Sequence, residues 1–203
     1  MSKNPKIKER TLVLVKPDGV QRSLVGEIIS RYERTGLKLV ALKFLIPNKE
    51  QVKKHYLIDS DWLRKCGQNT IDSYRKKGKK PLFENPVKYG EWVLGKLQKF
   101  LCAGPVTAMI WEGSDAAGVV KKITGPTEPS ISDVGTIRGD LTIDSYDLAD
   151  EDGRAVRNLV HVSGSPEEAK KEIKVWFKPG EILKYRLLNE AMLYDVNLDG
   201  IKE

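Results

Sequence analysis

The chain has 203 residues, of which 40% are hydrophobic and 31% are charged, a balance that suits one compact domain with a real core. No apolar run approaches the roughly 18 residues of a membrane helix, and the polar start, Met1 to Lys6, is not the pattern of a signal peptide. The net charge of +7 is concentrated in residues 59–100 (+5) and 1–10 (+3), which suits phosphate-bearing partners, nucleic acid included, or simply a solvated basic face.

The few histidines and cysteines narrow the chemistry further. Two histidines and two separated cysteines, Cys66 and Cys102, cannot build a usual zinc site. Reduced thiols in the cytoplasm are therefore the expectation for this chain.

The first third of the chain predicts two strands and two helices. A strand over Thr11–Val15 ends in the turn signal Lys16-Pro17-Asp18-Gly19, and a helix with fourfold apolar spacing follows over residues 23–35. A second strand is predicted over Leu37–Ile46. Asn48 then caps a short helix that runs to Tyr56.

Residues 57–103 differ in composition from the rest of the chain. The stretch 72–81 is polar and basic, whereas Trp62, Trp92 and Phe100 supply apolar anchor points. We predict a partly helical insertion over about 57–100.

The second half completes an alternating pattern. Its predicted elements are a buried strand over Val106–Trp111, a helix over Ala116–Ile123, a loop over Gly125–Gly139, an acidic irregular insertion over Ser145–Arg157, a strand at Val160 and a helix over Pro166–Phe177. The order strand, helix, strand, strand, helix, strand predicts an α+β, ferredoxin-like βαββαβ fold. We expect a four-stranded antiparallel sheet with helices on its faces, in one domain covering residues 1–203.

His161 stands at the end of the last predicted strand. Ser165, Pro166 and Glu168 follow as the capping box of a helix, so an imidazole at this junction would face a helix N-terminus, where anions bind. A histidine that accepts and passes on a phosphoryl group would suit this position. The alternative from this segment alone is a partly buried histidine with a structural role.

Other polar residues stand at the predicted chain turns, namely Lys16, Thr127, Arg138 and Asn158. Glu172 lies eleven residues after His161 on the following helix, beside the apolar stripe, and could reach the second imidazole nitrogen and orient the ring. A surface ion pair with a nearby lysine is the alternative role for Glu172.

Seven short motifs in order resemble the nucleoside diphosphate kinase family over roughly residues 9–56 and 100–194. They are Lys16-Pro17-Asp18-Gly19-Val20-Gln21-Arg22, His55-Tyr56, Gly104-Pro105-Val106, Trp111-Glu112-Gly113, Gly125-x-Thr127-x-Pro129, Gly135-Thr136-Ile137-Arg138-Gly139-Asp140 and Asn158-Leu159-Val160-His161, with Trp176-Phe177 closing the pattern. Each motif is weak alone, but their order is highly specific.

The resemblance implies a ping-pong reaction in which His161 carries the terminal phosphoryl group of a nucleoside triphosphate to a nucleoside diphosphate. It also implies Mg²⁺ bridging the nucleotide phosphates, with no dedicated protein ligand. The partners are nucleotides and further copies of the chain: a hexamer by resemblance, with a tetramer or dimer as alternatives, because the insertion at 145–157 lengthens a loop used in subunit contacts.

The resemblance also assigns roles to the site residues. Lys16 and Arg138 would hold the transferring phosphoryl group, Thr127 would donate a hydroxyl to a phosphate, and Tyr56 would support Lys16. Asn158, with Lys16, would bind the ribose hydroxyls. Glu172 would orient His161, and Ser163 would support the phosphorylated ring.

Several positions depart from the family pattern. Lys121 stands where an arginine is common, and Val162, Gly164 and Glu128 replace glycine, aspartate and asparagine. The aromatic residue that stacks on the base falls in the first insertion, where Phe83, Trp92 and Val93 all remain candidates.

Two other functions compete with this one. A ferredoxin-like nucleic-acid-binding module could use the basic insertion, although Phe44 is the sole aromatic on the first two predicted strands. A family relative without turnover is the other. The sequence Asp195-x-Asn197-x-Asp199-Gly200 resembles the start of a calcium-binding loop but lacks the required glutamate, so we interpret it as a polar tail.

Overall fold

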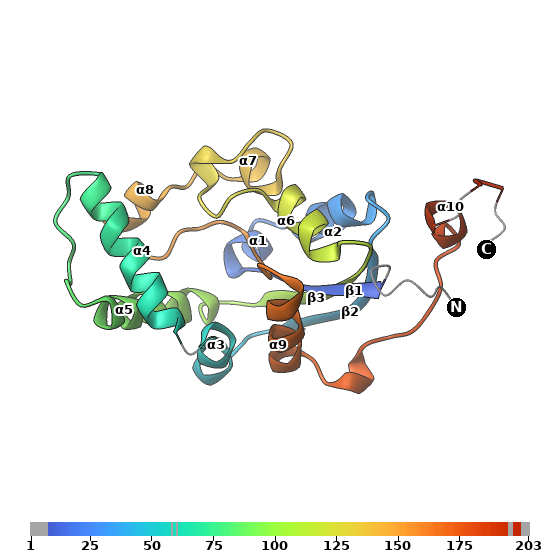
Figure 1. Cartoon of the computed structure of the whole chain (residues 1–203), viewed down its shortest axis with the longest axis horizontal. Coiled ribbons are helices and arrows are strands. Elements are labelled where there is room, and N and C mark those ends of the chain that lie inside the picture. The colour runs from blue at the N-terminus through green and yellow to red at the C-terminus, as the bar shows by residue number, and fades with distance from the viewer. Residues whose placement is uncertain (1–7, 58, 60, 195–196, 200–203) are drawn as a thin grey trace.

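The computed structural model describes residues 8–57, 59, 61–194 and 197–199 (Figure 1). The strands are β1 (Glu9–Val15), β2 (Lys38–Leu45), β3 (Val106–Gly113) and β4 (Val160–Val162). The helices are α1 (Pro17–Gln21), α2 (Val25–Glu33), α3 (Lys49–Tyr56), α4 (Trp62–Lys76), α5 (Pro86–Leu101), α6 (Ala116–Thr124), α7 (Ile137–Leu141), α8 (Tyr146–Glu151), α9 (Pro166–Trp176) and α10 (Glu190–Tyr194). The predictions made for Met1 to Lys6, and for Asp195 and Gly200 of the tail, lie outside the described residues.

The four strands form one antiparallel sheet in the order β2-β3-β1-β4. The central strand β1 pairs along its whole length with β3, and Leu14 lies opposite His161 of β4. This is the predicted ferredoxin-like α+β plan, and it places His161 directly beside β1, which ends at Val15, one residue before Lys16.

Each face of the sheet carries its own hydrophobic core. Leu12 and Leu14 of β1 point to the face covered by α3, α5 and α9, whereas Val13 and Val15 point to the face covered by α2, α6 and α7. Figure 1 shows these helices on the two sides of the sheet. Period-two alternation on a fully buried strand gives both cores from one short sequence.

The basic segment after α3 folds as a tightly packed helical hairpin of α4 and α5. Gly67 and Gly90 stand at the crossing, where an added Cβ would lie 1.8 Å from the Pro86 carbonyl oxygen and 2.1 Å from that of Leu63, respectively. Only glycine allows two helices to approach this closely. The predicted partly helical character of this segment is therefore confirmed, with more helix than the composition indicated.

Two local predictions were wrong. Residues 16–19, predicted as a turn, begin the short helix α1, because Pro17 takes the first helical position and needs no amide partner there. Residues 145–157, predicted as irregular, contain α8, whose cap is Ser145: its hydroxyl accepts a hydrogen bond from the Leu148 amide at 3.1 Å.

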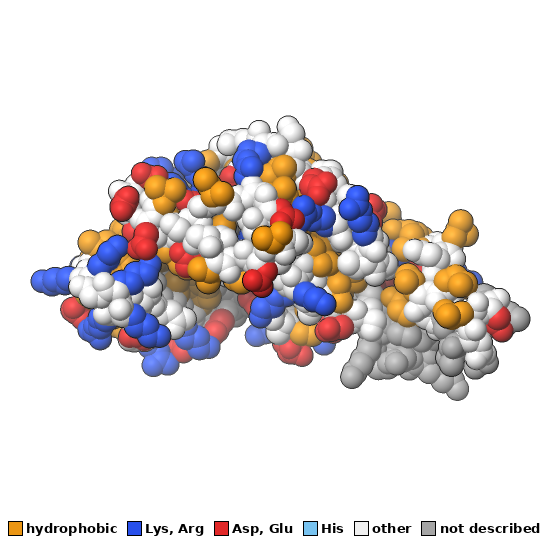
Figure 2. Space-filling view, turned by 90° about the horizontal axis from the view of Figure 1, so that it is seen from above, with side chains coloured by type: hydrophobic (Ala, Val, Ile, Leu, Met, Phe, Trp, Pro, Cys, Tyr) orange, Lys and Arg blue, Asp and Glu red, His pale blue; other side chains and the backbone are white. Residues whose placement is uncertain are grey.

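The surface charge follows the fold. Figure 2 shows Lys and Arg side chains gathered over the α4–α5 end of the molecule and hydrophobic side chains over the α10 end. Within the described part of the chain, no helix combines the length and apolar character needed to cross a membrane.

Candidate active site

His161 is held at one ring nitrogen. It lies on β4, its side chain is 16% exposed, and its Nε2 lies 2.9 Å from Glu172 Oε1 on α9. The other Glu172 oxygen accepts a hydrogen bond from the Ser163 hydroxyl at 2.5 Å, and Ser163 in turn accepts one from the Leu12 amide at 3.3 Å. Ser163 is therefore linked to the His161 ring through Glu172, and no hydrogen bond among the described residues joins Ser163 to the ring directly.

The charge of Glu172 fixes the tautomer of His161. Burial alone would raise the pKa of Glu172, but the nearby His161, its hydrogen bond and the Ser163 hydroxyl outweigh burial and hold the pKa at about 2. An ionised carboxylate can only accept hydrogen bonds, so the proton of a neutral His161 sits on Nε2. The lone pair on Nδ1 is then available as a nucleophile.

The second histidine packs against the first. The ring of His55 is fully buried and lies 4.4 Å from the His161 ring, centroid to centroid, in an edge-to-face arrangement. Burial, followed by the charge of His161, lowers the pKa of His55 to about 3, so His55 is neutral. Its Nδ1 accepts a hydrogen bond from Trp176 Nε1 at 3.2 Å, whereas its Nε2 has no partner among the described residues.

A strained residue precedes the histidine. Leu159 has φ of +65°, a left-handed conformation that costs a leucine about 1–3 kcal/mol. Two contacts hold it: the Leu159 amide donates to the buried Asp18 carboxylate at 3.0 Å, and the Leu159 carbonyl accepts from the Lys16 amide at 2.8 Å. This bend couples the end of β1 to the start of β4.

Lys16 brings a buried cation to the same place. Its Nζ donates to Asn158 Oδ1 at 2.6 Å and lies 5.8 Å from the centre of the Phe100 ring. Burial, followed by repulsion from Arg138, lowers the pKa of Lys16 to about 8. A buried ammonium group whose hydrogen-bond partner is a neutral amide oxygen is stabilised by a bound anion.

Arg138 is also buried, but most of its donors are occupied by backbone. Its guanidinium donates to the carbonyls of Gly125, Pro126, Asn158 and Val160 at 2.6–3.1 Å. Burial lowers its pKa. Arg138 thus joins the loop at 125–126 to β4, and one of its five N–H groups has no partner within the part of the chain that the structure describes.

The other predicted site residues lie farther out or make different contacts. The Thr127 carbonyl accepts from Asn158 Nδ2 at 2.7 Å, and the Thr127 side chain is exposed. Lys121 is exposed in the last turn of α6. Tyr56 packs on the rings of His55 and Trp62, with centroid distances of 4.8 and 5.3 Å, and no hydrogen bond within the described ranges joins it to Lys16.

The aromatic candidates for base stacking pack within the hairpin. Phe83 and Trp92 contact each other and Tyr89, and their faces carry the ammonium groups of Lys88 and Lys96 at 4.9 and 3.4 Å. Cations therefore already cover both rings. Val93 is half-buried.

The N-terminus of α9 is satisfied by its own side chains. The Ser165 hydroxyl accepts from the Glu168 amide, as the capping box predicts, but the Glu168 carboxylate binds the Gly164 amide at 2.8 Å instead of the Ser165 amide. The hydrogen bond of His161 goes instead to Glu172, in the second turn of this helix.

One group of possible metal ligands occurs among the described residues, formed by His55, His161 and Glu172 with ligand atoms within 4.8 Å of one another. Two imidazoles suit transition metals, whereas Mg²⁺ requires oxygen ligands. The described side chains therefore do not form a Mg²⁺ site by themselves.

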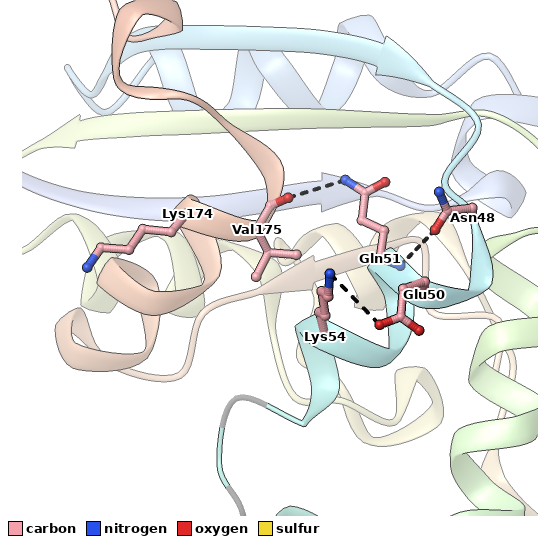
Figure 3. Close-up of a pocket in the computed structure, with 6 residues that line it drawn as sticks. All are labelled: Asn48, Glu50, Gln51, Lys54, Lys174 and Val175. Carbon is pink, nitrogen blue, oxygen red and sulfur yellow. Dashed lines mark hydrogen bonds and ion pairs between the residues drawn. The ribbon is translucent and has the colours of Figure 1, made fainter.

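A groove of about 420 Å³ lies elsewhere, between α3 and the end of α9 (Figure 3). Gln51 reaches across it to the Val175 carbonyl at 3.4 Å, and Lys54 lies 3.8 Å from Glu50 in an exposed pair. None of its six lining residues is a predicted site residue.

Sequence reasoning did not identify Asp18, Leu159 and His55 as parts of the site. Asp18 and His55 belong to two of the sequence motifs, but the motifs assign neither residue a role in the site. The left-handed φ of Leu159 has no signal in the sequence. Two sequence signals could have indicated His55: it is one of only two histidines in the chain, and the aromatic residue Tyr56 follows it directly.

On a ferredoxin-like sheet, a histidine that is hydrogen-bonded at one ring nitrogen, with no hydrogen-bond partner at the other among the described residues, lies with a buried lysine and arginine; this arrangement is typical of phosphoryl-transfer enzymes that use a histidine carrier. The family model for nucleoside diphosphate kinase matches residues 9–62 and 72–182. The chain belongs to the nucleoside diphosphate kinase family.

Individual relatives agree. The chain is 45% identical over 180 residues to the nucleoside diphosphate kinase of Pyrobaculum aerophilum, covering 87% of this chain and 98% of the relative. A crystal structure of an NDP kinase from that organism superposes with a TM-score of 0.84 at 43% identity, covering 87% of this chain and 100% of the other. A transition-state mimic of nucleoside-diphosphate kinase from Borrelia burgdorferi, with bound vanadate and ADP, gives a TM-score of 0.75 at 37% identity and covers 91% and 96% of the two chains.

Proposed function

We propose that the chain is an active nucleoside diphosphate kinase (EC 2.7.4.6) in which His161 Nδ1 carries the phosphoryl group. The observation that carries this proposal is the hydrogen bond between Glu172 and His161 Nε2, which leaves Nδ1 free. The match to the family model and the relatives of similar length support the activity.

The reaction consists of two matched transfers. Nδ1 attacks the γ-phosphorus of a nucleoside triphosphate, the bond from that phosphorus to the β,γ-bridging oxygen breaks, and a nucleoside diphosphate leaves. A second nucleoside diphosphate attacks the phosphohistidine through its terminal oxygen, and the phosphorus–nitrogen bond breaks. Throughout both steps Glu172 holds the Nε2 proton and stabilises the positive charge that develops on the ring.

The surrounding residues supply charge and position. We propose that Lys16 and the remaining N–H of Arg138 stabilise the transferring phosphoryl group, and that the hydroxyl of Thr127 and the ammonium group of Lys121 bind the outer phosphates. Asn158, which already binds Lys16, would also bind the ribose hydroxyls. Tyr56, whose ring centroid lies 6.4 Å from that of His161, would close the side of the ring.

Magnesium fits this site only as part of the substrate. The described residues offer no cluster of oxygen ligands, since the one group found contains two imidazoles. We propose that Mg²⁺ arrives bound to the phosphates of the nucleotide.

We propose a homo-oligomer, a hexamer by family resemblance, with a tetramer or dimer as the alternatives. The edge strand β2 leaves Phe44 64% exposed and Leu42 48% exposed, and Val134 and Ile143, which lie before and after α7, are each 93% exposed. Apolar side chains on a sheet edge and on loops are typical of subunit contacts. Light scattering after size exclusion would give the number of subunits.

We also propose a single domain, with insertions at about 57–100 and 145–157, that acts in the cytoplasm. The free thiols of Cys66 and Cys102 support that location.

Nucleic-acid binding by the first insertion stays secondary, because several of its cations are already paired: Arg64 with Asp61, Lys65 with Asp59 and Arg75 with Glu84.

Incubation with a triphosphate labelled at its γ-phosphorus tests the proposed function. We expect one acid-labile, base-stable label per chain, at His161, and rapid loss of the label on addition of any nucleoside diphosphate. His161→Gln should take up no label, whereas His55→Gln, which removes the chain's other histidine, should still be labelled at His161. Full exchange activity in His161→Gln would contradict the mechanism.

A further inference from the structure

The short helix α8 is anchored to the phosphate-binding side of the proposed site. The Tyr146 amide donates to Glu128 Oε1 at 2.8 Å, and Glu128 follows directly after Thr127. The Thr127 carbonyl accepts from Asn158, which binds Lys16. A continuous path of hydrogen bonds and covalent bonds therefore runs from the buried lysine to the first turn of α8.

The other side of α8 contacts the helical hairpin. Asp147 accepts from the ammonium groups of Lys77 and Lys79 at 3.1 and 3.0 Å. Burial, followed by hydrogen bonding to Asp150 of α8, raises the pKa of Tyr74 on α4. Figure 1 shows α8 beside one end of α4. Helix α8 thus connects the segment at residues 127–128 with the hairpin, and it joins the two segments interpreted as insertions.

The base of this segment is rigid. Arg154 forms two hydrogen bonds with the buried Asp144 carboxylate, at 2.6 and 2.9 Å, and the Arg157 amide donates to the same carboxylate at 2.6 Å. Residues 144 and 154–157 are therefore clamped together at the foot of the segment. Its tip, by contrast, is held by exposed ion pairs, with Lys79 52% and Asp147 53% exposed.

Tyr146 is the first residue of α8 and is 40% exposed, so an aromatic side chain stands open beside the Glu128 anchor of this helix. Burial, followed by the charge of Glu128, raises the pKa of Tyr146, while the positive charge of Arg138 lowers it. Tyr146 is therefore held next to Glu128 and lies within the electrostatic influence of Arg138, which binds the carbonyl next to His161.

We propose that α8 is a strap over the nucleotide site, that Tyr146 contacts the bound nucleotide from this strap, and that Asp147 holds the strap closed on Lys77 and Lys79. The proposal rests on the proposed function, since it assigns a further residue to the same nucleotide. The exposed ion pairs are weak and screened by salt, so the strap opens easily for nucleotide exchange.

The first test replaces Tyr146. In Tyr146→Ala we expect the KM for a nucleoside diphosphate to rise about tenfold, equivalent to about 1.4 kcal/mol, with kcat changed less than KM. Tyr146→Phe, which keeps the ring, should show whether the hydroxyl or the ring makes the contact, by matching the alanine variant or the parent chain respectively. Thermal unfolding confirms that each variant is folded. An unchanged KM in folded Tyr146→Ala would overturn the proposal.

The second test reverses charges. Asp147→Lys should raise the KM about threefold at low ionic strength, and the difference should vanish in about 0.5 M salt, where the Debye length is short. The combined exchange Lys77→Asp, Lys79→Asp and Asp147→Lys should restore the KM. Glu91→Lys, an equal charge change at an exposed site on α5, is the matched control and should leave the KM unchanged. Equal effects of Asp147→Lys and Glu91→Lys would show a general charge effect and overturn the strap.

Labelling separates this proposal from the proposed function. At saturating labelled triphosphate, Tyr146→Ala should reach the same one label per chain as the parent, because His161 and its neighbours are unchanged. Failure of the parent chain itself to be labelled would overturn the proposed function. Normal labelling of the parent with an unchanged KM in Tyr146→Ala would overturn only the strap.

Discussion

Lys16 and Lys79 each make a polar contact through an ammonium group, but in opposite surroundings. Lys16 is 6% exposed and binds the neutral Asn158 oxygen at 2.6 Å, within a set of buried hydrogen bonds that joins β1, β4 and the 125–127 loop. Lys79 is 52% exposed and binds the charged Asp147 at 3.0 Å, in an ion pair open to water. Buried, fully shared hydrogen bonds fix geometry, whereas exposed ion pairs contribute little free energy and allow movement.

The surroundings of His161 and the α4–α5–α8 end of the molecule therefore differ in how firmly they hold their side chains. Around His161, the buried hydrogen bonds hold the imidazole, the Glu172 carboxylate and the two cations in one arrangement. This arrangement includes a strained leucine and a lysine that has no ion-pair partner in the described part of the chain. At the α4–α5–α8 end, the interactions are replaceable and weak. We therefore expect changes near the sheet to have large effects and changes at the hairpin to have small ones.

The largest effect should come from Arg138→Met. This change removes the guanidinium donor from four backbone carbonyls, two of them buried and two partly buried, and we expect the free energy of unfolding to fall by about 4 kcal/mol, with loss of kinase activity. Denaturant unfolding would measure the change, with the exposed Arg22→Met as a control expected to stay within about 0.5 kcal/mol of the parent. A loss below about 1 kcal/mol would show that the carbonyl bonds of Arg138 do not hold the loop to β4.

Glu172→Gln should lower kcat by about 10²- to 10³-fold with little change in KM, because the amide cannot balance the charge on the phosphorylated ring. Glu168→Gln, one turn earlier on α9, keeps an acceptor for the Gly164 amide and should be close to the parent in both constants. Equal kcat in the two variants would remove Glu172 from the mechanism.

The wild-type Glu172 carboxylate should stay ionised, and its contribution to stability should persist from pH 4.5 upward and be lost as the pH falls toward about 2.

The lowered pKa of Lys16 predicts that phosphate binding weakens at alkaline pH. Because its pKa is about 8, the KM should rise as the pH increases through that value, and Lys16→Arg should abolish this limb because arginine stays charged. Steady-state kinetics from pH 6.5 to 9.5 would show it. An identical alkaline limb in both proteins would assign it to another group.

The same lysine should oppose folding at neutral pH. Its pKa is lower in the folded chain than the ordinary 10.5, so the unfolded state binds more protons between about pH 8 and 10.5, and the free energy of unfolding should rise with pH in that window. We expect Lys16→Met to be inactive yet more stable at pH 7 by about 1 kcal/mol, after allowance for the unpaired Asn158 oxygen. A clear loss of stability would contradict the underpaired state of this lysine.

The smallest effect should come from the hairpin surface. Arg75 and Glu84 form an ion pair in which both side chains are more than half exposed. Arg75→Ala should change the free energy of unfolding by less than about 1 kcal/mol, with the difference reduced further in high salt. A loss as large as that of Arg138→Met would end the distinction between the two regions.

The sequence predicts most of the sheet and little of the hairpin packing. The apolar run of β1 and the Asn48 cap, where the side chain accepts from the Gln51 amide at 2.8 Å, are local patterns, and the predictions made from them were confirmed. The close crossing of α4 and α5 depends on Gly67 and Gly90, 23 positions apart, whose meeting no local pattern announces. Helix α8 was missed because its charged sequence resembles a solvated loop and because its contacts with Glu128 and Lys79 join it to residues that are distant in the chain.

The site shows the same limit. The motifs name Lys16, Asn158 and His161 because each belongs to a contiguous run. The strained Leu159 and its partner Asp18 form a contact across 141 positions, which requires the folded sheet. The use of Arg138 on backbone carbonyls, rather than wholly on phosphate, likewise follows only from the loop and β4 lying side by side.

The most direct test of the central claim is to find which nitrogen bears the phosphorus. The chain, labelled with ¹⁵N-histidine and phosphorylated by a nucleoside triphosphate, has two histidines, so its spectrum is simple to assign. We predict phosphorus coupling to Nδ1 of His161 and a retained proton on Nε2. Phosphorus on Nε2, or on His55, would contradict the arrangement in which Glu172 holds one nitrogen so that the other can react.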